Sequence, residues 1–155
     1  MTIENNYYSI ACNELHYLEW GLKSPFYNSI AAQAQQVAEK MLKSVAELVC
    51  VNIEKLMTSH NLRGLYDVIH RVEPSFVFDR NRLSTLKDYY YDARYPGDNF
   101  ISVTQEECAD AVHIMYDVVK IVNEWREKHG YPAEEVIDRT FMVGNADGPS
   151  SVNSF

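Results

Sequence analysis

The feature that most constrains the fold is a stretch whose apolar residues recur every three or four positions. These residues are Ile30, Ala34, Val37, Met41, Val45 and Leu48. The spacing places them on one face of an α-helix about five turns long, and good helix formers fill most of the other positions. Such a helix must bury its apolar face against neighbouring elements, so the stretch predicts a helical domain.

The same period recurs elsewhere and predicts five helices, near residues 3–20, 25–52, 60–71, 79–93 and 104–129. The start signals are Ser24-Pro25, Ser59 and a capping box of Thr104 and Glu107, and the stop signals are Gly21, Pro74 and Gly130. No stretch shows the sustained two-residue alternation of a strand. We therefore predict an all-α fold, an up-and-down bundle of four to five helices.

The length of 155 residues fits one domain, and a hydrophobic share of 46% is enough for a core. We expect residues 1–130 to form the bundle and residues 131–155 to form a C-terminal extension. One more helical turn is predicted over residues 133–139. Residues 143–155 are predicted to be flexible, because Gly, Ser, Asn and Asp dominate there.

The sequence also predicts the compartment and excludes several kinds of site. It has no apolar run of about 18 residues, and residues 1–20 lack the features of a secretory signal, so we expect a cytoplasmic protein without a membrane segment. Its three cysteines lie far apart, which predicts buried free thiols. Because no phosphate loop, zinc motif or nucleophile elbow is found, no cofactor and no metal site are predicted.

Charge is unevenly distributed along the chain. The net charge of −8 disfavours sequence-blind binding to a phosphate backbone. Residues 63–94 contain six basic and five acidic residues, whereas residues 96–125 contain one basic and six acidic residues. An anion would therefore bind in the middle third of the chain.

Three short strings, in matching order and spacing, resemble the HEPN domain family. Residues 35–43 read QQVAEKMLK and are similar to its "QQxAEKxLK" helix. Residues 60–62 read HNL and resemble the "HxL" that follows, and residues 91–96 read YDARYP and resemble the "Y..ARYP" segment. The resemblance covers roughly residues 7–128. It implies a four- or five-helix bundle, often dimeric, that is associated with nucleotide or RNA chemistry.

The resemblance also implies a partner and an activity to test. Small prokaryotic HEPN proteins are frequently paired with a minimal nucleotidyltransferase in a toxin–antitoxin system. Many members are metal-independent ribonucleases in which an arginine is followed by a histidine after four to six intervening residues. Counting from Arg94, that histidine would fall on Asn99, Phe100 or Ile101, none of which can transfer a proton in this role. We therefore predict no catalytic residue.

The sequence leaves two ways in which a histidine could lie beside an arginine and form a ribonuclease-like pair. Arg63 and His70 satisfy the bare spacing, although a chain of this composition is expected to contain about one such match by chance. The fold could also bring His60 or His113 beside Arg94.

The candidate ligand-binding residues are Lys40, Lys43, His60, Arg94 and Tyr95. Lysine and arginine are natural partners of phosphate, so these cations could converge on a groove with the histidine. The alternative is that the lysines form the solvated flank of an amphipathic helix, and that Arg94 caps the end of its own helix. The run Tyr89-Tyr90-Tyr91 together with Tyr95 fits a core, a subunit interface or base stacking.

These observations favour a HEPN-family binding or regulatory module that binds a nucleotide or RNA and pairs with a nucleotidyltransferase. A homodimer is expected, because eleven tyrosines and two tryptophans exceed what a small bundle core readily buries. One alternative is an RNA-cleaving toxin with a non-standard site around Arg94. The other is a structural homodimer without a nucleotide ligand.

Overall fold

A computed structural model describes residues 2–86 and 88–145, and within them the chain is helical with no strand. The elements, in chain order, are α1 (Tyr7–Gly21), α2 (Tyr27–Val49), α3 (Glu54–Met57), α4 (Leu62–Val72), α5 (Arg80–Leu83), α6 (Tyr89–Asp92), α7 (Gln105–Lys128) and the 3₁₀ turn η1 (Thr140–Met142). The all-α prediction is confirmed. No helix in these ranges is both long and apolar enough to cross a membrane.

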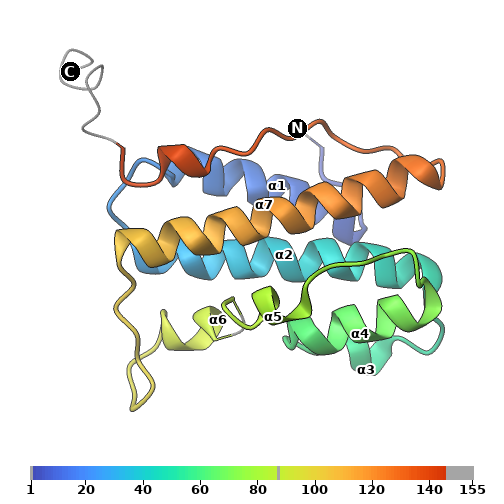
Figure 1. The fold of residues 1–155 in the computed structure, drawn as a ribbon, viewed down its shortest axis with the longest axis horizontal. Helices are drawn as coiled ribbons and strands as arrows, with labels where there is room; N and C mark the ends of the chain where they lie inside the picture. Colours follow the sequence, from blue (N-terminus) through green and yellow to red (C-terminus); the bar gives the residue numbers. More distant parts are fainter. Residues whose placement is uncertain (1, 87, 146–155) are drawn as a thin grey trace.

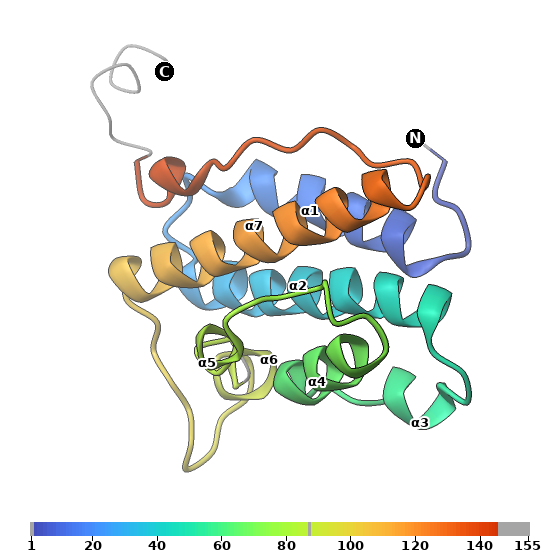
Figure 2. The ribbon, with the colours of Figure 1, turned by 45° about the vertical axis from the view of Figure 1, so that its right-hand side comes forward.

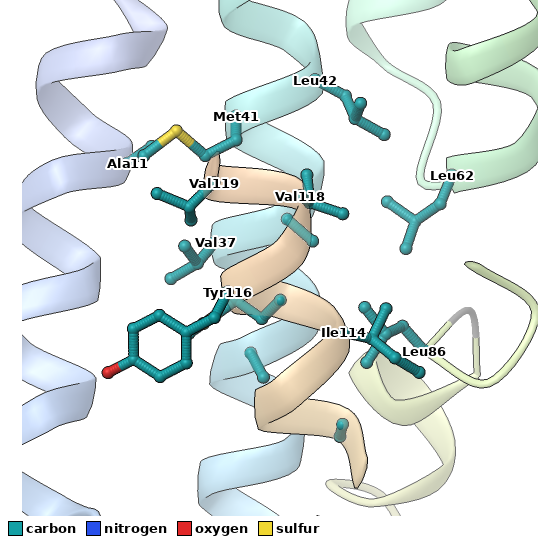
Figure 3. Packing of buried hydrophobic residues seen from close by; sticks show 14 of the residues in the cluster. Ala11, Val37, Met41, Leu42, Leu62, Leu86, Ile114, Tyr116, Val118 and Val119 are labelled. Carbon is teal, nitrogen blue, oxygen red and sulfur yellow. The ribbon is translucent and has the colours of Figure 1, made fainter. Parts of the chain in front are cut away.

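Helix α2 lies at the centre of the bundle. It contacts α1 and α7 along its length, and α4 and α6 pack on its other side (Figures 1 and 2). Figure 3 shows Val37 and Met41 of α2 beside Val119 of α7, with Ala11 of α1 close to Met41. The predicted apolar stripe is buried except at its last residue, Leu48, which is exposed one position before the helix ends.

The start of the last long helix was predicted correctly, whereas three other starts differ from the prediction. Helix α1 begins at Tyr7, capped by Asn6, rather than near residue 3. Thr104 and Glu107 form the expected capping box of α7. The hydroxyl of Ser24 instead donates to the Gly21 carbonyl, and α2 begins at Tyr27. Asn61, rather than Ser59, caps α4, because its side chain accepts a hydrogen bond from the Gly64 amide. Each difference moves the helix start by only a few residues.

The predicted helix over residues 79–93 is wrong, because the chain there forms two single turns, α5 and α6, joined by tighter turns. The amide of Leu86 bonds the Leu83 carbonyl, and the amide of Tyr89 bonds the Leu86 carbonyl. All three side chains are buried. Apolar residues spaced by three fit this tighter winding as well as they fit an α-helix.

After α7 the chain runs back over α1 and α7 as a segment that we call the strap, residues 131–145 (Figure 1). The turn predicted over residues 133–139 is absent, and the chain there is irregular until η1. The Glu134 amide donates to the Tyr8 hydroxyl at 2.7 Å, and the Asn123 side chain donates to the Glu134 carbonyl at 2.9 Å. Val143 is buried against the bundle, and the rest of the stretch predicted to be flexible, from residue 146, lies outside the described residues.

Candidate functional site

A buried carboxylate organises the side of α2 that faces α4 and α6. Glu39 is 2% exposed, and its Oε2 pairs with Lys43 Nζ at 3.0 Å. Its Oε1 lies 2.9 Å from His60 Nδ1 and accepts a hydrogen bond from Gln35 at 3.2 Å. Lys43 also donates to the Met57 carbonyl at 2.7 Å, so this network ties the α3 region to α2. Buried charges persist in proteins when they are paired in this way.

The contact with Glu39 sets the orientation of the His60 ring. An ionised carboxylate can only accept hydrogen bonds, so Nδ1 carries the proton and Nε2 is the nitrogen left for other contacts. The His60 side chain is 40% exposed. Glu39 therefore positions an imidazole whose second nitrogen is available to a ligand.

His60 belongs to an aromatic cluster that also holds an arginine. Its ring stacks on Tyr90 with a centroid distance of 5.0 Å and an interplanar angle of 16°. The guanidinium of Arg94 lies 4.9 Å from the centroid of the same Tyr90 ring and 5.5 Å from that of Tyr95. Tyr91 packs edge-on against Tyr90 at 4.7 Å. We call His60, Tyr90, Tyr91, Arg94 and Tyr95 the His60–Arg94 cluster.

Arg94 is exposed, and among residues 2–86 and 88–145 it forms no hydrogen bond or ion pair with its side chain. It does not cap the carbonyls at the end of α6, so that alternative is not what the structure shows. Its contacts are with the faces of aromatic rings, which leave the N–H groups at the edge of the guanidinium for a ligand.

Asn28 fixes the backbone that carries Arg94. Its side-chain amide donates to the carbonyls of Ala93 and Ile101, both at 2.8 Å. Its side-chain oxygen accepts from the Val103 amide at 2.7 Å. Three hydrogen bonds from one residue at the start of α2 therefore hold both ends of the segment 93–103.

The structure brings together some of the predicted ligand-binding residues and separates others. His60, Arg94 and Tyr95 lie in one cluster. Lys43 is 3% exposed and is engaged by Glu39 and Met57, so it has a structural role beside the cluster. Lys40 faces α1, where it binds both carboxylate oxygens of Glu14 at 2.5 and 2.7 Å. It does not converge with His60 and Arg94.

The two ways that the sequence leaves for a histidine to lie beside an arginine have different outcomes. His70 Nδ1 lies 2.9 Å from the Phe76 carbonyl, and its ring stacks on Tyr66, which is a structural role. His113 pairs with acidic residues on α7 and the strap. Of His60, His70 and His113, His60 is the one that packs against the same ring as Arg94, the ring of Tyr90.

A groove of about 480 Å³ opens beside Arg94, between α1 and α2. Its walls include Gln33 and Gln36 of α2 and three strongly exposed aromatic residues. Their exposed fractions are 73% for Tyr17, 93% for Trp20 and 68% for Phe26. Arg94 thus belongs both to the His60–Arg94 cluster and to the wall of an aromatic groove.

Sequence reasoning missed Glu39 and Asn28, the two residues that position the cluster. Glu39 lies two residues after Val37, about 200° around the helix, on the face opposite the predicted apolar stripe, where a charged side chain is expected to face solvent, so the pattern does not reveal its burial. Asn28 offered no signal either, since its partners are 65 to 75 residues away in the chain.

The fold and the cluster define an all-α bundle whose central helix organises a candidate anion site. A family model described as HEPN domain matches residues 5–125. Because the match covers most of the 155 residues, the chain belongs to the HEPN domain family, and the resemblance seen in the sequence is confirmed. Comparisons with curated proteins and with solved structures found no match.

Proposed function

We propose that this chain is a non-catalytic HEPN module that binds a phosphate-bearing ligand, a nucleotide or the end of an RNA, at the His60–Arg94 cluster. The observation that carries the proposal is that the Arg94 guanidinium has no carboxylate partner among the described residues. Lys40, Lys43 and Arg80 are each paired with a carboxylate, whereas Arg94 contacts only aromatic rings within the described residues.

The cluster offers three kinds of contact to such a ligand. The Arg94 guanidinium can donate two parallel hydrogen bonds to phosphate oxygens. The Nε2 atom of His60, whose ring stacks on the same Tyr90 ring that Arg94 contacts, offers a second polar group that donates when the ring is protonated. Tyr91 and Tyr95 are 52% and 49% exposed, and their ring faces can stack on a base.

Calorimetric titration of the full chain with mononucleotides and short 5′-phosphorylated RNAs tests this function. We expect Arg94→Ala to weaken binding at least about tenfold, the size of one charge-assisted contact. Lys40→Ala is the matched control and should bind normally, because Lys40 is engaged by Glu14 on the α1 side. Equal affinity of wild type and Arg94→Ala would place the ligand elsewhere, and no binding by the wild type would favour the structural dimer.

A second candidate is the RNA-cleaving toxin, and the Glu39–His60 contact favours it. A carboxylate that fixes one imidazole nitrogen and leaves the other available is the arrangement of a general base. The expected histidine after Arg94 is nevertheless missing, and the net charge of −8 opposes a polyanion. We expect no cleavage of labelled RNA above buffer controls in the presence of a chelator. Cleavage that is lost in both His60→Ala and Arg94→Ala would instead establish the toxin.

We also propose that the exposed aromatic side of the groove is a homodimer interface. Tyrosine and tryptophan are enriched at interfaces, and Trp20 is 93% exposed in the single chain. Sedimentation of the wild type should give twice the 17.9 kDa of one chain. Trp20→Ser should lower the mass to one chain, while Phe141→Ser, which removes a 70% exposed aromatic residue from η1, should not. A dimer that survives Trp20→Ser would locate the interface elsewhere.

A nucleotidyltransferase partner, a toxin–antitoxin setting and a cytoplasmic location complete the proposal, and they rest on the family resemblance and the sequence. A small nucleotidyltransferase encoded beside this chain that co-purifies with it would support the pairing. Purification of the co-expressed pair as separate proteins would argue against it.

A further inference from the structure

A second group of polar side chains lies on α7 and the strap, away from the residues used above. His113 and Asp117 are one helical turn apart on α7, and Asp138 comes from the strap. His113 Nδ1 lies 3.0 Å from an oxygen of Asp138, and His113 Nε2 lies 3.5 Å from an oxygen of Asp117. One donor atom from each residue lies within 4.8 Å of the other two.

This donor set matches the chemistry of a transition-metal ion. One imidazole nitrogen and two carboxylate oxygens are ligands that Zn²⁺ and its first-row neighbours accept, with bonds of about 2.1 Å. A tetrahedral ion with such bonds separates its ligand atoms by about 3.4 Å. His113 faces Asp138 and Asp117 with different ring nitrogens, and an ion binds one of them, so the other aspartate must turn toward that nitrogen to complete the site. The side chains of His113 and Asp138 are 52% and 41% exposed, so an ion and its remaining water ligand have access.

The groups around the three donors orient them. One oxygen of Asp138 accepts hydrogen bonds from the Thr140 amide at 2.8 Å and the Thr140 hydroxyl at 2.5 Å, and the other oxygen faces His113. Arg82 pairs with Asp117 at 2.8 Å. Hydrogen bonds of this kind fix the direction of a ligating carboxylate, while the positive charge of Arg82 competes with a metal ion for Asp117.

A cleft that shares two of the three donors extends the negative charge beside them. It has a volume of about 350 Å³ and lies between α7 and the strap. Asp117 and Asp138 are shared with the donor group, and Lys120 is the one basic residue in the lining. Its acidic residues are Asp117, Glu124, Glu127, Glu134, Glu135 and Asp138. A cleft lined by charge of one sign raises the local concentration of oppositely charged ions, here divalent cations.

We propose that His113, Asp117 and Asp138 bind a divalent first-row transition-metal ion, best matched by Zn²⁺, which fastens the strap to α7. The proposal is independent of the phosphate site, because none of its residues belongs to the His60–Arg94 cluster. The ion has a structural role here, since it joins two elements that are otherwise held by hydrogen bonds and ion pairs.

The chain contains a matched control for this site. His16 on α1 also contacts a strap carboxylate, with its Nε2 atom 2.8 Å from Glu134, and lies 3.5 Å from Glu19. Among the described residues, the donor atoms of His113, Asp117 and Asp138 all lie within 4.8 Å of one another, and those of His16, Glu19 and Glu134 do not. Loss of His16 therefore removes a similar strap contact without removing a metal ligand.

The test is titration of the full chain with Zn²⁺ by calorimetry and with Co²⁺ by visible absorption. We expect one ion per chain, binding at least about tenfold weaker in His113→Ala, and unchanged binding in His16→Ala. Arg82→Gln should tighten binding by about fivefold, because a competing charge is removed. Zn²⁺ should also slow amide exchange in residues 131–145 of the wild type and not of His113→Ala. The same Co²⁺ spectrum and affinity in His113→Ala, or no binding by the wild type at millimolar Co²⁺, would overturn the proposal.

Discussion

Replacing Glu39 by alanine should destabilise the protein far more than replacing an average surface glutamate. The side chains of Glu39 and Lys43 are 2% and 4% accessible, so the variant leaves the Lys43 ammonium buried without a counter-charge, with the Met57 carbonyl as its hydrogen-bond acceptor and the Tyr7 ring 5.7 Å away. Removing one partner of a buried ion pair typically costs about 3–5 kcal/mol. The hydrogen bonds from His60 and Gln35 to Glu39 are lost as well, so we expect a value within this range.

Two further variants test whether the loss of stability comes from leaving Lys43 buried without its partner. Lys40→Ala, at the neighbouring position, breaks the pair with Glu14, whose side chains are 22% and 23% accessible, and should cost about 1 kcal/mol or less. The double variant Glu39→Met with Lys43→Met replaces the buried pair by apolar side chains of similar length. It should be within about 2 kcal/mol of wild type, because no unpaired charge is left buried.

Urea unfolding at pH 7, followed by circular dichroism, measures all four proteins. The urea concentration at the midpoint of unfolding should change. The slope of the unfolding free energy against urea concentration should stay constant, since the surface exposed on unfolding is nearly unchanged. A cost below about 1 kcal/mol for Glu39→Ala would refute the reasoning. So would a double variant as unstable as Glu39→Ala, because the unpaired lysine would then not be the cause.

Three further predictions concern other parts of the bundle. Asn28→Ala removes three hydrogen bonds and should cost about 2–4 kcal/mol and speed amide exchange in residues 93–103. Thr104→Ala removes the cap of α7 and should cost about 1 kcal/mol in urea unfolding. Burial raises the pKa of the Cys12 and Cys108 thiols from 9.0 to about 12, so the unfolded chain loses these protons first. Stability should therefore fall between pH 9 and pH 12, less steeply in Cys108→Ala, as urea midpoints would show.

The long helices could be predicted because their signals are local. The apolar stripe of α2 and the capping box of α7 each lie within one helix, and both are present in the structure. The division of residues 79–93 into α5 and α6 could not be predicted, because Leu83 and Leu86 reach the core equally well from either kind of turn. Tertiary packing decides between the two.

The candidate site was partly predictable for a related reason. His60, Arg94 and Tyr95 were identified from short strings, and the structure shows that they share one aromatic cluster. Glu39 and Asn28 act on residues that lie 21 to 75 positions away, so their roles depend on contacts that only the folded chain contains. The same holds for Lys40, whose partner Glu14 belongs to another helix.

The distribution of charge also limits the length of nucleic acid that the proposed site can hold. Arg94 and, when protonated, His60 are the cations of the cluster, whereas the cleft between α7 and the strap is lined by six carboxylates. Each phosphate contact with a single strand contributes about −0.7 to the slope of log affinity against log salt. We expect a slope between about −0.7 and −1.4 for a 5′-phosphorylated trinucleotide and for a twelve-nucleotide RNA alike, measured from 50 to 400 mM salt as a rough working range. A slope steeper than about −3 for the longer RNA would require several more phosphate contacts than this cluster provides. It would show that RNA follows an extended surface of the protein rather than binding by one end.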